Sequence, residues 1–303
     1  MLVPCPGVAD RSDQVAEKVF MSALHTGQLE AEDTETQDKQ EARAFLRKQR
    51  WAQISLRLWQ FGVLIAALVA WQLVYHFQLL DSVILRSPGQ VFGYLRDAIE
   101  DGELQDNTWA TMQAVVTAFA LAGIVGIVAG LTLGLLPRVN QVLSPFLDAV
   151  NAMPRIALAP VFIVWLGIGV GAKVALAFSL VVFIVLANTQ AGVKSADSEI
   201  VRLSWVLGTN RLQLFVKVLL PVAVPSIFAG LRLGLIYALL AVVGSEIIAA
   251  QNGLGQRVAY YSSVYKLEAV YGMLLVLAAI AAILNMLMSA AERWLLRWQP
   301  PNR

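Results

Sequence analysis

The chain has 303 residues, of which 58% are hydrophobic and only 15% are charged, with a formal net charge of +2. Soluble domains usually carry about 25% charged residues, so this composition excludes a soluble globular protein. Several apolar runs reach the ~20 residues that a helix needs to cross ~30 Å of hydrocarbon. The sequence therefore predicts an integral membrane protein, and we expect a lipid bilayer but no nucleic acid among its partners.

The first 53 residues are polar and predict a cytoplasmic tail. Residues 30–41 (EAEDTETQDKQE) are acidic and indicate a largely disordered segment, which a basic amphipathic stretch around Trp51 follows. The N-terminus has no apolar core, so we expect no cleaved signal peptide. Cys5 is the single cysteine, which excludes an intrachain disulfide.

Residues 54–299 predict one transmembrane domain with six helical spans. We expect helices because a backbone exposed to lipid must satisfy its own hydrogen bonds. The spans are placed at 58–79, 108–135, 142–166, 173–194, 219–250 and 267–291.

Glycines mark the faces on which these spans pack. Gly126, Gly130 and Gly134 recur every fourth position, as do Gly230 and Gly234. Small residues at this spacing let helix backbones approach closely. We expect the packing to occur within one subunit.

Lysine and arginine residues are distributed unevenly between the connections. One side of the predicted membrane collects Arg43, Arg47, Lys48, Arg50, Arg57, Arg138, Lys194, Arg202, Arg211, Lys217, Arg293, Arg297 and Arg303. The other side has Arg86, Arg96, Lys173, Arg257 and Lys266. The positive-inside rule therefore predicts an inner-membrane protein with both termini in the cytoplasm.

The connection at 197–217 contains an amphipathic pattern that a simple turn does not need. Ile200, Leu203 and Leu207 fall on one helical face, and Gly208 stands where a helix ends in the left-handed conformation.

A second short helix is expected after this glycine. Asn210 is a good N-cap, and Gln213 three residues later completes a capping box. Pro221 can then open the next span, since the first helical turn needs no N–H from it. The segment predicts either an interfacial loop lying on lipid or a docking element for a cytoplasmic partner.

The same segment resembles a known family. Gly208, then nine residues, Val218, one residue, and Leu220–Pro221 are similar to the EAA loop of ABC importer permeases. The segments NAMPRIALAPVFIVWLGIG, NTQAGV, PVAVPSIFAGLRLGL and NGLG strengthen the resemblance, which points to the nitrate, sulfonate and taurine branch. That branch also includes permeases for pyrimidine precursors of thiamine.

The resemblance implies an all-α type I ABC importer permease fold with cytoplasmic coupling helices. It implies a homodimer, cytoplasmic ATPase subunits docked at 197–217 and an extracytoplasmic solute-binding protein. The implied coupling residues are Arg202, Leu203, Ser204, Trp205, Leu207, Gly208, Arg211, Leu220 and Pro221. The first three occupy the Glu-Ala-Ala positions of the family, so a cation replaces the usual carboxylate.

The chain lacks a G-x-x-x-x-G-K-[ST] loop, so it cannot bind ATP by that route. We expect no enzymatic activity and no cofactor in this chain, with ATP bound by the partner subunit. His25 and His76 have no clustered ligands nearby in sequence, so we expect no metal site.

Polar residues inside apolar spans are candidates for the translocation path, because charges there are costly. The candidates are Arg155, Asn188, Glu246 and Asn285. Arg155 could attract an anionic substrate; the alternative for Arg155 and Glu246 is a structural ion pair or a headgroup contact.

The predicted function is the transmembrane permease subunit of an ATP-driven importer for a small organic anion such as a sulfonate or taurine. Within the same class, a pyrimidine precursor or nitrate remains an alternative substrate. An ion-coupled secondary transporter is the alternative from another class, although the last four spans offer it few buried carboxylates.

Overall fold

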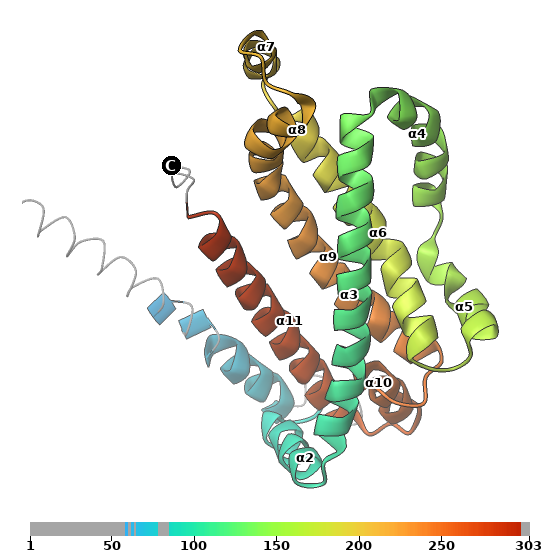
Figure 1. Ribbon diagram of the computed structural model, residues 1–303. Helices are drawn as coiled ribbons and strands as arrows, with labels where there is room; N and C mark the ends of the chain where they lie inside the picture. The colour runs from blue at the N-terminus through green and yellow to red at the C-terminus, as the bar shows by residue number, and fades with distance from the viewer. Residues whose placement is uncertain (1–57, 60–61, 64, 78–84, 298–303) are drawn as a thin grey trace, which may run out of the picture. The chain divides into compact units, whose positions relative to one another are not determined.

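The computed structural model describes residues 58–59, 62–63, 65–77 and 85–297, so the predictions on residues 1–53 and on Cys5 lie outside its described residues. The chain divides into two units, Met1–Leu73 and Val74–Arg303. The second unit carries all the elements discussed below, and every regular element described in it is a helix (Figure 1).

The helices of this unit follow one another through short connections. They are α2 (Pro88–Glu100), α3 (Glu103–Leu135), α4 (Pro137–Ala152), the 3-10 turn η1 (Arg155–Leu158), α5 (Ala159–Leu166), α6 (Val170–Lys194), α7 (Ser198–Val206), α8 (Arg211–Leu214), the π-helical turn η2 (Phe215–Leu219), α9 (Leu220–Ile248), α10 (Leu254–Ser263) and α11 (Leu267–Leu295).

Four of the described helices are long and apolar enough to cross a membrane. They are Glu103–Leu135, Val170–Lys194, Arg211–Ile248 and Leu267–Leu295, which correspond to four of the expected spans. The expected first span, 58–79, is described only in part and contains the apolar helix Ile65–His76. The count of six spans therefore stays a prediction.

The region of the expected span at 142–166 is a broken pair of helices. The segments Pro137–Ala152 and Arg155–Leu166 are bent by 79° relative to each other. Met153 has an extended backbone with ψ of 138°. A residue before proline avoids the helical region, and proline itself has no N–H to donate, so Pro154 ends α4 and forces a new start.

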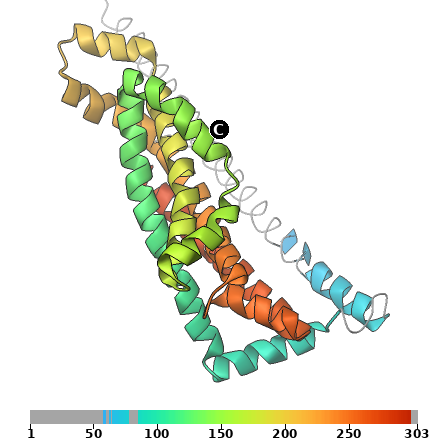
Figure 2. The same ribbon diagram turned by 90° about the vertical axis from the view of Figure 1, so that its right-hand side faces the viewer.

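The core of the unit lies between α3, α6 and α9, which run side by side in both ribbon views (Figures 1 and 2). Its buried side chains are mostly alanine and valine, which keeps the helices close together. They include Ala114, Val115, Ala118, Ala122, Ala177, Val181, Val185, Ala238 and Val242.

The glycine pattern serves this packing, as predicted. A Cβ atom on Gly126 would lie 2.8 Å from the Cβ of Val185, and one on Gly130 would lie 2.6 Å from the Cβ of Thr189. A Cβ on Gly230 would lie 2.6 Å from that of Asn188. The prediction that these glycines pack helices within one subunit is confirmed.

A second buried cluster joins α2, α10 and α11 at the end of the bundle away from α7 (Figure 1). The Tyr261 hydroxyl donates a 2.6 Å hydrogen bond to Glu103, which also pairs with Arg257 at 3.2 Å. Tyr94 packs edge-on against Tyr261. Burial raises the pKa of both phenols, so both stay protonated donors at neutral pH.

Replacing Gly130 by alanine should destabilise the protein. The added methyl would meet the Thr189 side chain and the Leu186 carbonyl oxygen, 2.7 Å away, and backbone cannot move aside as a flexible side chain can. Overpacking of this kind costs about 1–3 kcal/mol. Thermal unfolding of the purified protein in detergent should therefore show a lower midpoint for Gly130→Ala.

Gly244→Ala is the matched control, since Gly244 lies within α9 and a Cβ there would meet nothing within 4 Å. Its midpoint should equal or exceed that of the parent, because alanine favours a helix over glycine by about 1 kcal/mol. Equal losses in both variants would contradict the close packing of α3 on α6.

Candidate functional site

The connection between α6 and α9 begins with α7, whose ends are both capped. The Asp197 carboxylate accepts a 2.8 Å hydrogen bond from the backbone N–H of Glu199. At the other end Gly208 has φ of 76°, so the predicted left-handed conformation is confirmed. Figure 1 shows α7 projecting from the end of the bundle opposite α2 and α10.

Gly208 closes α7 with a double hydrogen bond. Its N–H donates to the Trp205 carbonyl at 3.0 Å, and the Thr209 N–H donates to the Ser204 carbonyl at 3.2 Å. This is the Schellman arrangement, in which a left-handed residue lets two carbonyls at the helix end find donors. The Thr209 hydroxyl also donates to the Ser204 carbonyl, so the corner is held by three bonds.

The capping box after the corner is confirmed. Asn210 and Gln213 exchange bonds of 3.0 and 2.8 Å between side chain and backbone. The expected second short helix is α8, which passes through η2 directly into α9, so that the helical stretch Arg211–Ile248 is 38 residues long.

The π-helical turn η2 explains how this continuity is reached. The N–H of Leu220 bonds the Phe215 carbonyl, five residues earlier, just before Pro221 enters the first turn of α9. Proline cannot donate to the carbonyl four residues before it, and a π-turn is a common way to absorb such a local misfit without breaking the helix. Pro221 thus lies at the start of α9 as expected, but the π-turn before it, and not a free helix end, accommodates its missing N–H.

An apolar surface covers the outer side of this connection, which we call the coupling surface. Its large exposed side chains are Leu203, Trp205, Val206, Leu207 and Leu212, and Leu207 is 74% exposed. Ser204 is buried at the corner, and its hydroxyl donates to the Ile200 carbonyl at 2.8 Å. Arg202 and Arg211 are exposed beside this surface, and the described residues give neither an ion-pair partner.

The structure does not bring the four predicted translocation residues together. Asn188 lies on α6, where its side chain donates to the Ile184 carbonyl at 2.8 Å and packs on Gly230. Asn285 lies exposed on α11. Assigning these two residues to the path remains a prediction.

Arg155 lies buried in η1, at the break between α4 and α5. Its guanidinium donates to the Ser179 carbonyl of α6 and, at 2.7 Å, to the Asn151 side chain. It also lies over the ring of Phe183, 4.2 Å from the centroid. Within the described residues it has no carboxylate partner, so the alternative of an ion pair with Glu246 is wrong.

Glu246 is enclosed at the opposite end of α9 from the coupling surface. Its carboxylate is fully buried and pairs with Lys173 of α6 at 2.9 Å. It also accepts bonds from the Thr111 hydroxyl of α3 at 3.0 Å and from the Gly255 N–H of α10 at 2.9 Å. Glu246 therefore forms a structural ion pair, which was one of the alternatives predicted for it. Its partner, Lys173, was predicted to lie among the charges on the outer side of the membrane.

The loop before α10 folds back over this carboxylate. Lys173 donates to the Asn252 carbonyl at 2.7 Å, and the Gly253 N–H donates to Asn107 at 2.9 Å. A Cβ on Gly253, whose φ is 117°, would lie only 2.1 Å from a Glu246 oxygen. The NGLG segment therefore needs glycine so that its backbone can approach the carboxylate.

Sequence reasoning missed Lys173 because a lysine near the start of a span is usually a surface charge. The signal was its spacing: Lys173, Leu176 and Ala177 fall on one helical face with Val181, and all four are buried. A lysine that continues the apolar face of a span predicts a buried carboxylate opposite it.

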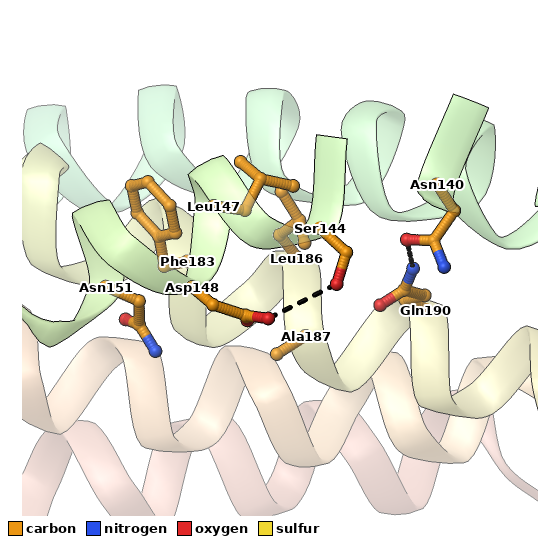
Figure 3. A pocket seen from close by; sticks show the side chains of 9 residues that line it. All are labelled: Asn140, Ser144, Leu147, Asp148, Asn151, Phe183, Leu186, Ala187 and Gln190. Carbon is orange, nitrogen blue, oxygen red and sulfur yellow. Dashed lines mark hydrogen bonds between the residues drawn. The ribbon is translucent and has the colours of Figure 1, made fainter. Parts of the chain in front are cut away.

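A polar pocket between α4 and α6 was also missed (Figure 3). It offers about 80 Å³ of space open to water. Its lining residues are Asn140, Ser144, Leu147, Asp148, Asn151, Phe183, Leu186, Ala187 and Gln190. The sequence signal that could have predicted this pocket is a row of polar residues at helical spacing within residues 140–151. The second half of this row lies close to Arg155 in the chain.

Comparisons with known proteins identify the family of this chain. The family described as the binding-protein-dependent transport system inner membrane component matches residues 122–299. The chain belongs to this family. It is an ABC importer permease, the inner-membrane subunit of such a transport system.

Individual relatives of the permease align with most of its chain. It is 31% identical over 259 residues to the taurine transport system permease protein TauC of Escherichia coli K12, covering 83% of this chain and 93% of the relative. It is 32% identical over 254 residues to the riboflavin transport system permease protein RibX of Chloroflexus aurantiacus, covering 84% and 93%.

The fold of the permease also matches a solved structure. The MetNI methionine ABC transporter in an inward-facing conformation aligns with a TM-score of 0.56 at 18% identity, covering 63% of this chain and 94% of that one. At this identity the likeness establishes the fold, that of a type I importer permease, and nothing about the substrate.

Removing one partner of the Lys173–Glu246 pair should strongly destabilise the permease. A single member left buried without its counter-charge costs about 3–5 kcal/mol. Lys173→Met and Glu246→Gln should each lower the unfolding midpoint in detergent, and the double variant should recover part of the loss.

Arg96→Met serves as the control, because Arg96 and Glu100 form an exposed pair at 2.8 Å on α2. Such surface pairs contribute little, about 0.3–0.5 kcal/mol. Single variants of the buried pair that unfold at the same temperature as Arg96→Met would contradict a stabilising role for the cluster around Glu246.

Proposed function

We propose that this permease carries a small organic anion, a sulfonate or a taurine-like solute, across the membrane for an ATP-driven importer. The support for the substrate class comes from its relatives, since the Escherichia coli protein is named for taurine and a 26% identical Bacillus subtilis protein for aliphatic sulfonates. Because the chain belongs to the permease family, we do not retain the alternative of an ion-coupled secondary transporter.

A heterocyclic substrate is the second candidate. One relative, 32% identical, is named for riboflavin, and another, 33% identical over 146 residues, is named for formylaminopyrimidine. Nitrate, the third substrate of the branch, finds no support among these relatives' names.

We further propose that the coupling surface is the docking site of the ATPase subunit. The observation that carries this proposal is its combination of exposed apolar side chains with a rigidly capped corner at Gly208. Exposed leucine and tryptophan side chains of this density are typical of a protein interface. The exposed Arg202 and Arg211 then predict acidic groups on the ATPase beside its apolar cleft.

The continuity of α8, η2 and α9 gives the docking site a mechanical role. A helical stretch of 38 residues spans about 57 Å at 1.5 Å per residue, more than the thickness of a bilayer. A tilt imposed on α8 by the ATPase would pass along α9 to the Glu246 cluster. In this way ATP binding would alternate access to the translocation path.

The assembled importer has two copies of the permease, two ATPase subunits and an extracytoplasmic solute-binding protein in this proposal. Its termini and coupling surface lie in the cytoplasm. Only 11% of the apolar segment of α11 is buried within the subunit, which leaves this helix free to contact lipid or the second copy.

Uptake measurements test the substrate class. Cells that lack their own sulfonate uptake systems would express the permease together with its ATPase and binding protein, and accumulate labelled taurine. Excess unlabelled taurine or ethanesulfonate should suppress uptake, whereas riboflavin, formylaminopyrimidine and nitrate should not. Suppression by a heterocycle alone would replace the sulfonate assignment with the second candidate.

Gly208→Val should uncouple the permease from its ATPase. A β-branched residue at a φ of 76° is disfavoured by about 1–2 kcal/mol, so α7 should rotate relative to α8. The variant should insert into the membrane and yet capture the ATPase poorly in pull-downs, with no substrate-stimulated ATP hydrolysis.

Gly102→Val is the matched control, because it introduces the same backbone strain at another position. Gly102 has φ of 78° and open space around its Cβ position, as Gly208 has, but it precedes α3 at the other end of the bundle. Capture of the ATPase should survive this substitution. Undiminished capture and coupled hydrolysis by Gly208→Val would mean that the coupling surface merely lies on lipid.

A further inference from the structure

The polar pocket between α4 and α6 follows a regular stripe on α4. Asn140, Ser144, Asp148 and Asn151 are spaced by four, four and three residues, so they fall on one face of the helix. Figure 3 shows the Ser144 and Asp148 side chains bonded to each other, with Gln190 of α6 reaching Asn140. The stripe lines the pocket instead of facing lipid.

Asp148 belongs to a helix pair that is apolar enough to enter a membrane. It lies within α4, 11 residues beyond Pro137, the first residue of the helix. Ionisable groups within apolar membrane segments mark pathways and binding sites, since they would otherwise be replaced by apolar residues.

The carboxylate of Asp148 has one hydrogen-bond donor and no counter-ion among the described residues. Ser144 donates to it at 3.2 Å, and the side chain remains exposed to the pocket. Of the three amides that line the pocket, Asn140 and Gln190 bond to each other and Asn151 accepts from Arg155, which leaves the carboxylate unpaired. A second group that carries positive charge and N–H donors would complete the site.

The other end of the pocket carries positive charge. Asn151 accepts a 2.7 Å bond from the buried Arg155 guanidinium, which also lies over the pocket residue Phe183. This guanidinium has no carboxylate partner within the described residues, so its charge is not neutralised by another protein group nearby. The pocket therefore presents a negative group on one side and a positive field on the other.

We propose that this pocket binds a small zwitterion, with its ammonium group on Asp148 and its anionic group toward Asn151 and Arg155. The inference rests on the proposed function and narrows it from organic anions in general to amino-substituted ones. An ammonium suits the site better than a metal ion does, because Ca²⁺ and Mg²⁺ need several oxygen ligands with more negative charge than one carboxylate supplies.

Cysteine modification of the purified full-length permease tests the site without an ATPase or binding protein. On a Cys5→Ser background, Ala187→Cys places one thiol in the pocket. It should react faster with cationic aminoethyl methanethiosulfonate than with anionic sulfonatoethyl methanethiosulfonate. Asp148→Asn, which keeps the shape of the side chain, should reduce this preference about tenfold or more, as loss of a nearby unit charge predicts.

Protection by ligands identifies the recognised group. Taurine and β-alanine share an ammonium but differ in their acidic group, whereas ethanesulfonate resembles taurine without the ammonium. The first two should slow modification of Cys at position 187, and Asp148→Asn should abolish that protection. Ala191→Cys, one turn further along α6 and outside the pocket, is the matched control and should show neither effect.

The outcomes separate this inference from the proposed function. Equal reaction with both reagents in the parent, or equal protection by ethanesulfonate and taurine, would overturn the zwitterion site. Protection by taurine and β-alanine that depends on Asp148 would support it even if uptake measurements point to a different acidic group. Uptake of sulfonates without any protection at position 187 would leave the substrate class standing and overturn the pocket.

Discussion

The enclosure of the Glu246 carboxylate is the constraint on which the arrangement of the helices depends. A buried carboxylate is tolerated only if every lone pair and its charge are satisfied. The Glu246 carboxylate on α9 has three such partners: a hydroxyl of α3, an ammonium group of α6 and a backbone N–H of α10. These contacts join four helices at one point, and the loop at 252–255 closes over it.

The close packing of α3, α6 and α9 continues the contact between these helices along the bundle. In lipid the hydrophobic effect does not drive helices together, so contact area and hydrogen bonds must do so. Glycines such as Gly126 and Gly130 let the backbones approach until side chains of α6 fill the space a Cβ would occupy. The result is a closely packed core, to which α9 connects the coupling surface through the π-turn before Pro221.

The break at Pro154 differs from the core, because a pocket lies beside it whereas the core is closely packed. Carbonyl groups at the end of α4 lose their helical donors there. The Arg155 side chain, held against α6, supplies a positive group near that helix end, where it also complements the helix dipole. The polar face of α4 is thereby turned toward α6 and forms the pocket in place of a continuous apolar contact.

The sequence by itself determined the membrane class, four of the spans, the glycine packing and the local chemistry of the corner at Gly208. Each of these follows from composition, from helical spacing or from a conformation that only a few residues adopt, so short-range rules suffice. Only the tertiary structure decided the partner of Glu246 and the pocket at Asp148. Those features join residues far apart in the chain: Lys173 and Glu246 meet because α6 and α9 pack side by side. No local pattern states which distant charge will lie opposite, since that depends on how the helices are packed.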